Sequence, residues 1–436
     1  MKKVAVISLG CDKNRVDTEH MLYRLVRGGY EVSDISDAEI IIVNTCAFIE
    51  SARQESIDNI LECARFKTDG KCEKLIVTGC LPQKYRGELE QALPEVDAFL
   101  GAFEYEKILS VIEDGGAQMP EEQFYAAENC GRILTTFPHV AYLKIAEGCN
   151  NKCTFCTIPS IRGAYRSRPL GDIVGEASAL VNDGVKELIL VAQDVTRYGG
   201  DIGESLVGLL DELEKLPVEI IRLMYCYPEQ VTDELIGKIS SSRKIAKYID
   251  VPVQHASDGV LKRMNRKSTS AQTEALINKL HAAGIAVRTT LMVGFPGETQ
   301  ADFDALCEFI ERTRPEYAGV FAYSKEDGTP AARLPDQVKR SDKIKRVKRL
   351  GAICTECTHD FNKSLVGKTV RVLYEDVDYD KNLFVGRAEF QAPEVDGVVY
   401  FTGNNVDVGK FYDVKITSCD EYDLYGEADN PEEMKV

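Results

Sequence analysis

Residues 140–156 read VAYLKIAEGCNNKCTFC, and this stretch sets the architecture of the central part of the chain. Its first half is mainly apolar, which is typical of a buried strand. Its second half places Cys149, Cys153 and Cys156 in a C-x3-C-x2-C pattern directly after that strand. Because the three thiols lie in one loop, they can converge on one centre without long-range folding. The pattern predicts a metal or iron–sulfur site at the end of the strand.

The number of cysteines in this loop separates two kinds of site. Three cysteines are one ligand short of a structural zinc site, which takes four. An iron–sulfur cube held by three cysteines keeps one iron free for an exogenous ligand. A zinc site completed by a distant histidine is the alternative, with His139 and His255 as candidates. Neither histidine has a zinc-motif spacing from the cysteines, so the sequence favours the iron–sulfur cube.

Alternating strands and helices continue on the carboxyl side of the cysteine loop. After the strand at residues 140–146, further strands are expected at residues 187–193, 219–225, 248–254, 286–294 and 317–322. Helical patterns separate these strands, which gives a run of βα-like units. The run predicts a full or partial (β/α) barrel, whose functional loops lie at the carboxyl ends of the strands.

The amino-terminal part of the chain predicts a second parallel sheet. Expected strands alternate with expected helices, and the strands are continuously apolar. Such strands are typical of a Rossmann-like α/β sheet that is covered on both faces. The strands are at residues 3–9, 39–44 and 74–78, and the helices are at residues 14–27, 50–66 and 83–93.

Each of these three amino-terminal strands is followed at once by a cysteine. The cysteines are Cys11, Cys46 and Cys80, separated by 35 and 34 residues. Because the carboxyl ends of parallel strands meet at one edge of the sheet, the three thiols are expected to meet there. Burial as ordinary apolar cysteines is the alternative. Strand-end loops are not core positions, so the repeated placement favours a shared metal site.

Length, charge and cysteine content narrow the class of protein. The chain has 436 residues with 53 Lys and Arg against 70 Asp and Glu, a net charge of −17. Its acidity argues against a generic polyanion binder and leaves a basic protein partner open. No apolar run approaches the roughly 20 residues that span a bilayer, and no signal-peptide core is present, so we expect a cytoplasmic protein without a membrane partner. Fourteen cysteines in a reducing compartment indicate metal or redox chemistry.

The carboxyl-terminal part changes character. Residues 366–427 contain short alternating strands separated by Gly, Asn and Asp turns, which predicts a small all-β barrel of the OB-like kind. This segment has six Lys and Arg against thirteen Asp and Glu. An OB-like barrel that grips RNA needs a positive groove, so the acidic segment favours a basic protein partner.

The cysteine loop resembles the signature of the radical S-adenosylmethionine (SAM) superfamily, and the whole chain resembles the methylthiotransferases within it. Three further segments resemble the methylthiotransferase sequences: GCNNKC at residues 148–153, VPVQH at residues 251–255 and MVGFPGET at residues 292–299. The resemblance implies an α/β multidomain protein with three parts. These are an amino-terminal methylthiotransferase domain at 1–130, a partial radical-SAM barrel at 138–362 and a TRAM domain at 364–430.

The same resemblance implies two [4Fe-4S] clusters and S-adenosylmethionine as cofactors. The barrel cluster would cleave S-adenosylmethionine to a radical that abstracts hydrogen. The second cluster would carry the sulfur that is methylated and inserted into the substrate. No catalytic side chain is expected beyond the cluster ligands, and a one-electron reductant protein is an implied partner. The ligands are Cys11, Cys46 and Cys80 for one cluster and Cys149, Cys153 and Cys156 for the other.

Side chains for the organic part of S-adenosylmethionine are expected at the mouth of the barrel. Gln193, Asp194 and Gln254 end expected strands, and Arg288 suits the methionine carboxylate. Phe155 suits packing against the adenine. Loop capping or simple packing is the alternative for each of them. Three arginines after the cysteine loop are expected to contact the substrate or the facing domain: Arg162, Arg166 and Arg168.

Two branches of the family differ in substrate. Residues 9–17, LGCDKNRVD, resemble the ribosomal-protein (RimO) type, whereas the transfer-RNA (MiaB) type more typically has GCQMN here. Together with the acidic tail, this predicts methylthiolation of an aspartate β-carbon in a basic small-subunit ribosomal protein, number twelve, free or within the ribosome. An adenosine in transfer RNA is the alternative substrate, and a zinc-stabilised scaffold without catalysis is the alternative class. The basic residues 338–350 are interpreted as a solvated helix face, with contact to ribosomal RNA as the alternative.

Overall fold

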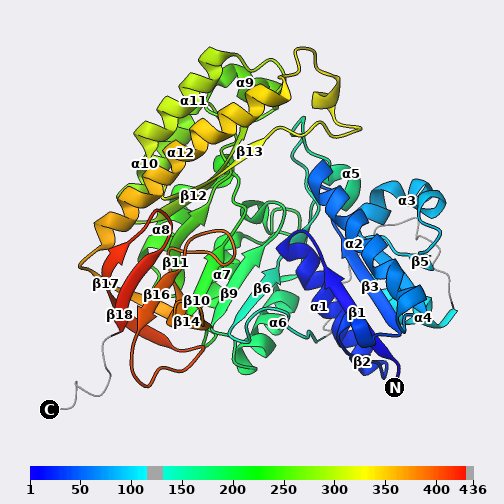
Figure 1. The fold of residues 1–436 in the computed structure, drawn as a ribbon. Helices are drawn as coiled ribbons and strands as arrows, with labels where there is room; N and C mark the ends of the chain where they lie inside the picture. Colours follow the sequence, from blue (N-terminus) through cyan, green and yellow to red (C-terminus); the bar gives the residue numbers. More distant parts are fainter. Residues whose placement is uncertain (115–130, 429–436) are drawn as a thin grey trace.

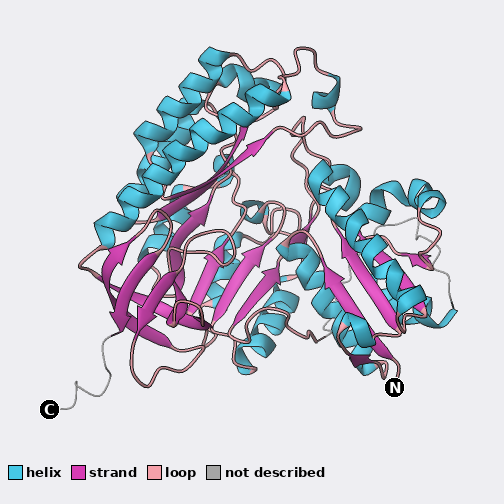
Figure 2. Ribbon diagram, in the orientation of Figure 1, coloured by secondary structure: helices cyan, strands magenta, loops and turns pink. Residues whose placement is uncertain are grey.

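The computed structural model describes residues 1–114 and 131–428. The sequence at residues 115–137 is polar and weakly periodic, which predicts a linker, and most of this segment lies outside the described residues. Three units follow one another along the chain, as Figure 1 and Figure 2 show: an amino-terminal α/β sheet, a larger open barrel and a small β-barrel. In the described part of the chain, no helix is both long and apolar enough to cross a membrane.

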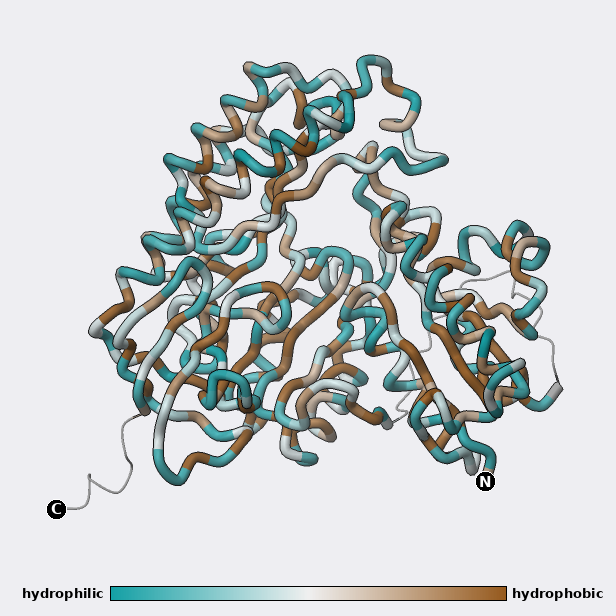
Figure 3. The backbone as a smooth tube through the Cα atoms, in the orientation of Figure 1, coloured by the Kyte–Doolittle hydropathy of each residue, from teal (hydrophilic) through white to brown (hydrophobic). Residues whose placement is uncertain are grey.

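The amino-terminal unit is a parallel five-stranded sheet in the order β2-β1-β3-β4-β5, which confirms the Rossmann-like prediction. All six residues of the central strand β3 are buried, because helices cover both faces of the sheet. Figure 3 shows hydrophobic strands under more hydrophilic helices here. The strands are β1 (Lys3–Ser8), β2 (Glu31–Val32), β3 (Ile40–Thr45), β4 (Lys74–Gly79) and β5 (Ala98–Phe99), and the helices are α1 (Asp12–Arg27), α2 (Glu50–Asp69), α3 (Cys80–Ala92) and α4 (Ile108–Asp114).

The central unit is a parallel six-stranded sheet in the order β13-β12-β11-β10-β9-β6. Strands β6 and β13 are its two edges and do not pair, so the barrel is partial. Its outer face packs against helices, and its inner face packs against the third unit. The strands are β6 (Val140–Lys144), β9 (Glu187–Val191), β10 (Ile220–Leu223), β11 (Ile245–Asp250), β12 (Ala286–Val293) and β13 (Tyr317–Ala322). The main helices are α6 (Leu170–Asn182), α7 (Leu206–Leu213), α8 (Asp233–Ser241), α9 (Asp258–Arg263), α10 (Ser270–Ala282) and α11 (Gln300–Thr313).

The last helix and the small barrel complete the chain. Helix α12 (Arg340–Leu365) contains the basic stretch and is longer than the expected helix at residues 338–350. Five strands then form a closed barrel, β14-β15-β16-β18-β17, called the terminal barrel below, which confirms the OB-like prediction. Its strands are β14 (Thr369–Asp378), β15 (Leu383–Ala388), β16 (Val399–Thr402), β17 (Phe411–Cys419) and β18 (Leu424–Ala428).

The terminal barrel is fixed to the inner face of the partial barrel by buried polar contacts. Arg387 pairs with Glu187 at 2.6 Å, and Arg222 donates a 2.7 Å hydrogen bond to the carbonyl oxygen of Glu389. Arg222 and Glu187 are themselves paired at 2.7 Å. The lower part of the barrel interior is therefore filled by the chain itself, and the carboxyl ends of its strands face the amino-terminal unit (Figure 1).

Candidate metal centres

The first candidate centre, called the amino-terminal cysteine site, consists of Cys11, Cys46 and Cys80. These residues follow the adjacent strands β1, β3 and β4. A Cβ atom added at Gly10 would lie 2.7 Å from the Cβ of Cys46, so the Cys11 loop touches Cys46. Burial, together with the nearby Cys11 and Cys46, raises the pKa of the Cys80 thiol to about 12, although the Arg162 guanidinium opposes this shift. The three cysteines therefore lie at neighbouring strand ends on one edge of the sheet.

The second candidate centre, called the barrel cysteine site, consists of Cys149, Cys153 and Cys156. It lies in the loop between the short strand β7 (Ala146–Glu147) and helix α5 (Ile158–Arg162). Burial raises the pKa of Cys149 to about 11 and that of Cys156 to about 12, and Cys153 adds to both shifts. The Sγ atom of Cys153 is 3.1 Å from the hydroxyl oxygen of Tyr227.

Polar side chains give the barrel cysteine loop its shape. Asn150 accepts a 3.0 Å hydrogen bond from the backbone N–H of Tyr165. The side-chain amide of Asn151 donates a 2.9 Å hydrogen bond to the fully buried carboxylate of Asp194. Asp194 therefore holds the loop in place through Asn151.

The other side chains expected at the barrel mouth have different surroundings. Gln193 donates a 2.5 Å hydrogen bond to Glu147, beside the barrel cysteine site. Phe155 packs edge-on against Phe295 with ring centres 6.4 Å apart. Gln254 has a left-handed backbone, with φ 73°, and its backbone bonds the middle of β12.

Arg288 lies on β12 between two carboxylates. Its guanidinium is 3.2 Å from Asp250 at the end of β11 and 3.3 Å from Asp396 in the terminal barrel. The side-chain carboxylates of both residues are almost fully buried. The charge of Arg288 is thus already balanced by protein groups, and the structure places it at the junction with the terminal barrel.

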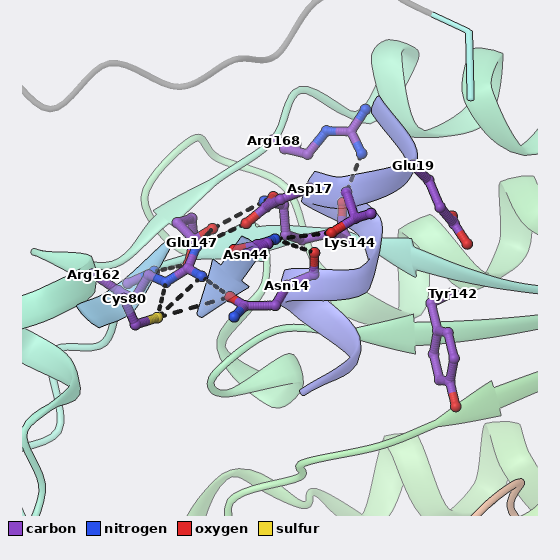
Figure 4. Close-up of polar contacts among 12 residues, drawn as sticks. Asn14, Asp17, Glu19, Asn44, Cys80, Tyr142, Lys144, Glu147, Arg162 and Arg168 are labelled. Carbon is purple, nitrogen blue, oxygen red and sulfur yellow. Dashed lines mark hydrogen bonds and ion pairs between the residues drawn. The ribbon is translucent and has the colours of Figure 1, made fainter. Parts of the chain in front are cut away.

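Four buried charged side chains lie beside Cys80 of the amino-terminal cysteine site (Figure 4). Asp17 comes from α1, Lys144 is the last residue of β6, Glu147 belongs to β7, and Arg162 comes from α5. Arg162 is 3.0 Å from Asp17 and 3.2 Å from Glu147, and Lys144 is 3.0 Å from Glu147 and also pairs with Asp17. Two cations and two anions make the group neutral. Burial alone would raise the pKa of Glu147, but Arg162 and Lys144 outweigh it and lower this pKa to about 2.

Arg162 connects this charged group directly to a cysteine of the amino-terminal site. Its Nε and Nη2 atoms donate hydrogen bonds of 3.4 and 3.3 Å to the Sγ atom of Cys80. Nη2 also donates to the side-chain oxygen of Asn14. This confirms that Arg162 contacts the facing domain. Arg168 instead bonds within the partial barrel, to the carbonyl oxygen of Lys144 at 2.7 Å.

Sequence reasoning missed four residues that join the two sites: Asn14, Asp17, Lys144 and Glu147. Asn14 and Asp17 lie within residues 9–17, LGCDKNRVD, whose resemblance to the RimO type indicated a branch of the family but no role for either side chain. Lys144 and Glu147 carried a weaker signal, because they are charged residues within an apolar strand pattern.

Three cysteine thiols at each site are the donor type that iron–sulfur clusters use. Within residues 1–114 and 131–428, no group of three or more His, Cys, Asp or Glu side chains is arranged to hold a single metal ion. In an iron–sulfur cube each thiolate binds a different iron, so its ligands stand farther apart than those of one ion. The two histidines considered for zinc lie elsewhere: His139 is 3.9 Å from Glu375 of the terminal barrel, and His255 is 3.8 Å from Glu298.

Three family models match successive parts of the chain. Residues 3–101 match an uncharacterized protein family, UPF0004, residues 143–310 match the radical SAM superfamily, and residues 366–428 match the TRAM domain. Curated relatives match almost the whole chain. The ribosomal protein uS12 methylthiotransferase RimO of Geotalea uraniireducens is 48% identical over 98% of both chains. The enzyme of the same name from Geobacter sulfurreducens is 46% identical over 98% of both, and that from Clostridium botulinum strain Hall is 46% identical over 97% of both.

Solved structures with a similar fold are radical SAM enzymes. The radical S-adenosylmethionine methyltransferase TsrM from Kitasatospora setae, with cobalamin and a [4Fe-4S] cluster bound, has a TM-score of 0.54 at 14% identity, covering 76% of this chain and 77% of that one. The cobalamin-dependent radical enzyme OxsB has a TM-score of 0.52 at 12% identity, covering 81% of this chain and 56% of that one. At these identities the likeness shows the shared fold alone.

Proposed function

The chain belongs to the radical SAM methylthiotransferase family, in its RimO group, and from this membership we propose that it methylthiolates ribosomal protein uS12. The observation that carries the proposal is the full-length likeness to RimO enzymes at up to 48% identity, including both three-cysteine sites within the matched length. The proposed target atom is the β-carbon of an aspartate. We further propose domain bounds of 1–130, 138–362 and 364–430.

We propose that each cysteine site holds one [4Fe-4S] cluster. When bound, these clusters and S-adenosylmethionine supply a radical that abstracts hydrogen, together with the sulfur and methyl group that are transferred. The protein's own contribution is to ligate and position. Cys11, Cys46 and Cys80 provide one set of thiolates and the loop of residues 149–156 provides the other. Cys46 and Cys80 are buried, whereas Cys11 and the three cysteines of the barrel site are partly exposed.

We propose different roles for the side chains expected to bind S-adenosylmethionine. Phe155 and Gln254 lie on loops beyond the strands and suit contact with its organic part. Gln193 and Asp194 act beside the cofactor by holding Glu147 and the cysteine loop. To bind the methionine carboxylate, Arg288 would have to give up its ion pair with Asp250 or Asp396. We therefore rank Arg288 below the other side chains as a ligand of S-adenosylmethionine.

The charge of the terminal barrel supports a protein substrate. Its segment at residues 366–427 has thirteen acidic and six basic residues, an excess of seven acidic ones. This charge suits a basic ribosomal protein better than RNA. We propose that the enzyme works in the cytoplasm on uS12, free or within the ribosome, and receives electrons from a one-electron reductant protein.

Mass spectrometry of a strain that lacks the gene tests the substrate. We expect uS12 from this strain to lose the mass of one methylthio group and to regain it when the gene is restored. Transfer RNA from the same cells serves as the internal control and should keep its modifications. Loss of a methylthio group from transfer-RNA adenosine, with uS12 unchanged, would show that the MiaB-type substrate is the correct one.

A further inference from the structure

The contact between Arg162 and Cys80 joins two elements that belong to different cysteine sites. Helix α5, which carries Arg162, begins two residues after Cys156 of the barrel site. Cys80 belongs to the amino-terminal site and begins α3. The fork of Nε and Nη2 spans this boundary, with both donor atoms within 3.4 Å of the same sulfur (Figure 4).

The surroundings of Arg162 keep its guanidinium in one orientation. Its side chain is only 2% exposed. Nη1 is taken by Asp17 and Glu147, and Nη2 is shared between Asn14 and Cys80. Because nearly every donor has a partner, the group cannot turn away from Cys80 without leaving a buried charge unpaired.

A cation held at this position acts on a cluster bound by Cys80. The Cys80 sulfur here stands for the thiolate that would bind iron. Hydrogen bonds to a cysteine ligand and a nearby positive charge stabilise the more negative, reduced form of an iron–sulfur cluster. Both effects raise its reduction potential.

We propose that Arg162, on helix α5 of the partial barrel, is a positioning residue that sets the reduction potential of the amino-terminal cluster. The inference rests on the proposed function, since it requires a cluster at Cys11, Cys46 and Cys80. It adds a specific task for the charged group of Asp17, Lys144, Glu147 and Arg162, namely to hold one guanidinium against one cluster ligand.

The test uses the full-length protein with Cys149, Cys153 and Cys156 replaced by alanine, so that only the amino-terminal cluster remains. In this background we compare native Arg162 with Arg162→Lys and Arg162→Gln by redox titration monitored by EPR. We expect a shift to more negative potential in both variants, smaller for lysine, which keeps the charge but loses the forked donor. Arg162→Lys keeps the test valid if Arg162→Gln fails to fold.

Arg53→Gln is the matched control. Arg53 also links the amino-terminal unit to the partial barrel, through a 3.1 Å ion pair with Glu326. It donates a hydrogen bond to Tyr85 and, among the residues that the structure describes, to no cysteine. It should leave the potential unchanged. An unchanged potential in Arg162→Lys or Arg162→Gln protein with full iron content would overturn the inference alone, and so would an equal shift in Arg53→Gln. Absence of any cluster in the starting background would overturn the proposed function together with it.

Discussion

Asn14 and Asp17, two residues of the LGCDKNRVD segment, have structural roles at the amino-terminal cysteine site. The side-chain amide of Asn14 donates to the carbonyl oxygens of Leu9 and Thr45, at 3.0 and 2.9 Å, and so ties together the loops that precede Cys11 and Cys46. Its side-chain oxygen accepts from Arg162, and Asp17 pairs with the same arginine. The residues that follow Cys11 therefore stabilise the loops of the cysteine site and also form its contact with the partial barrel.

Replacing Cys46 by alanine should separate the tasks of the two sites. We expect the iron content of the reconstituted protein to fall from about eight to about four atoms per chain, because one cube loses a ligand. Transfer of the methylthio group should be abolished, while reductive cleavage of S-adenosylmethionine at the barrel site continues. Iron and sulfide analysis and assay of 5′-deoxyadenosine measure these outcomes.

Cys63→Ala is the control for this variant, because Cys63 is buried in the core of the same unit, outside both cysteine sites. It should retain full iron content. Loss of 5′-deoxyadenosine formation from Cys46→Ala protein that still holds the barrel cluster would contradict the assigned division of tasks.

The junction between β4 and α3 is the element that brings Cys80 into place. Gly79 has φ +99°, and an added Cβ would lie 2.3 Å from the side-chain oxygen of Asn44 and 2.6 Å from the carbonyl oxygen of Thr45. Both neighbours belong to β3, the strand that leads to Cys46. The close approach of the two strand ends therefore requires glycine here.

Gly79→Ala should destabilise the amino-terminal unit by roughly 2–4 kcal/mol, because alanine disfavours a positive φ and its Cβ would clash with the end of β3. The substitution should also reduce iron binding at the cysteines of this unit. Gly87→Ala is the matched control in α3, the helix that Gly79 precedes, where an added Cβ meets nothing within 4 Å. It should stabilise the helix by about 0.5–1 kcal/mol. Urea unfolding followed by circular dichroism gives both values, and equal effects of the two substitutions would refute the role of Gly79.

The order and type of the strands could be predicted from sequence, but several of their ends could not. The strand expected at residues 248–254 ends at Asp250, because Gln254 adopts a left-handed backbone and makes only an isolated bridge to Leu291. The strand expected at residues 140–146 stops at Lys144, and Ala146–Glu147 pairs instead with β8 (Arg166–Ser167). Apolar residues continue past both ends, so periodicity alone does not reveal the change.

Across the whole molecule, the placement of Cys11, Cys46 and Cys80 after neighbouring strands followed from strand order, whereas the contacts between units did not. Asp17 and Lys144 are 127 residues apart, and Glu187 and Arg387 are 200 residues apart. In the sequence, none of these residues can be distinguished from an ordinary charged residue. The partner of each becomes evident only from the packing of the units against each other. Pairs of this kind depend on three-dimensional arrangement that a single sequence does not display.

The buried pair of Glu187 and Arg387 predicts how docking of the terminal barrel depends on pH. Burial alone would raise the pKa of Glu187, but Arg387 and Arg222 lower it to about 2, below its ordinary value of 4.5. A carboxylate with a lowered pKa contributes stability above its unfolded value, and this contribution is lost as pH falls through the folded value. The contribution of Glu187 is therefore complete above about pH 4.5 and lost towards pH 2.

Glu187→Gln should lower the free energy of unfolding by roughly 3–5 kcal/mol at pH 7, because two buried arginines lose a partner. The difference from the native protein should shrink as pH falls from about 4.5 to about 2. Glu219→Gln is the control, since Glu219 pairs with Arg371 across the same interface at an exposed position and should cost under about 1 kcal/mol. Denaturant titrations at several pH values measure both, and a pH-independent difference for Glu187→Gln would contradict the assignment.

EPR of the reduced protein tests most directly whether two separate clusters face each other across the interface of the two larger units. Two alanine variants are needed, one lacking Cys11, Cys46 and Cys80 and the other lacking Cys149, Cys153 and Cys156. We expect each variant to give the spectrum of one isolated [4Fe-4S] cluster and the native protein to give a spectrum broadened by magnetic interaction between two. A native spectrum that equals the simple sum of the two, or a variant that loses both signals at once, would contradict the account.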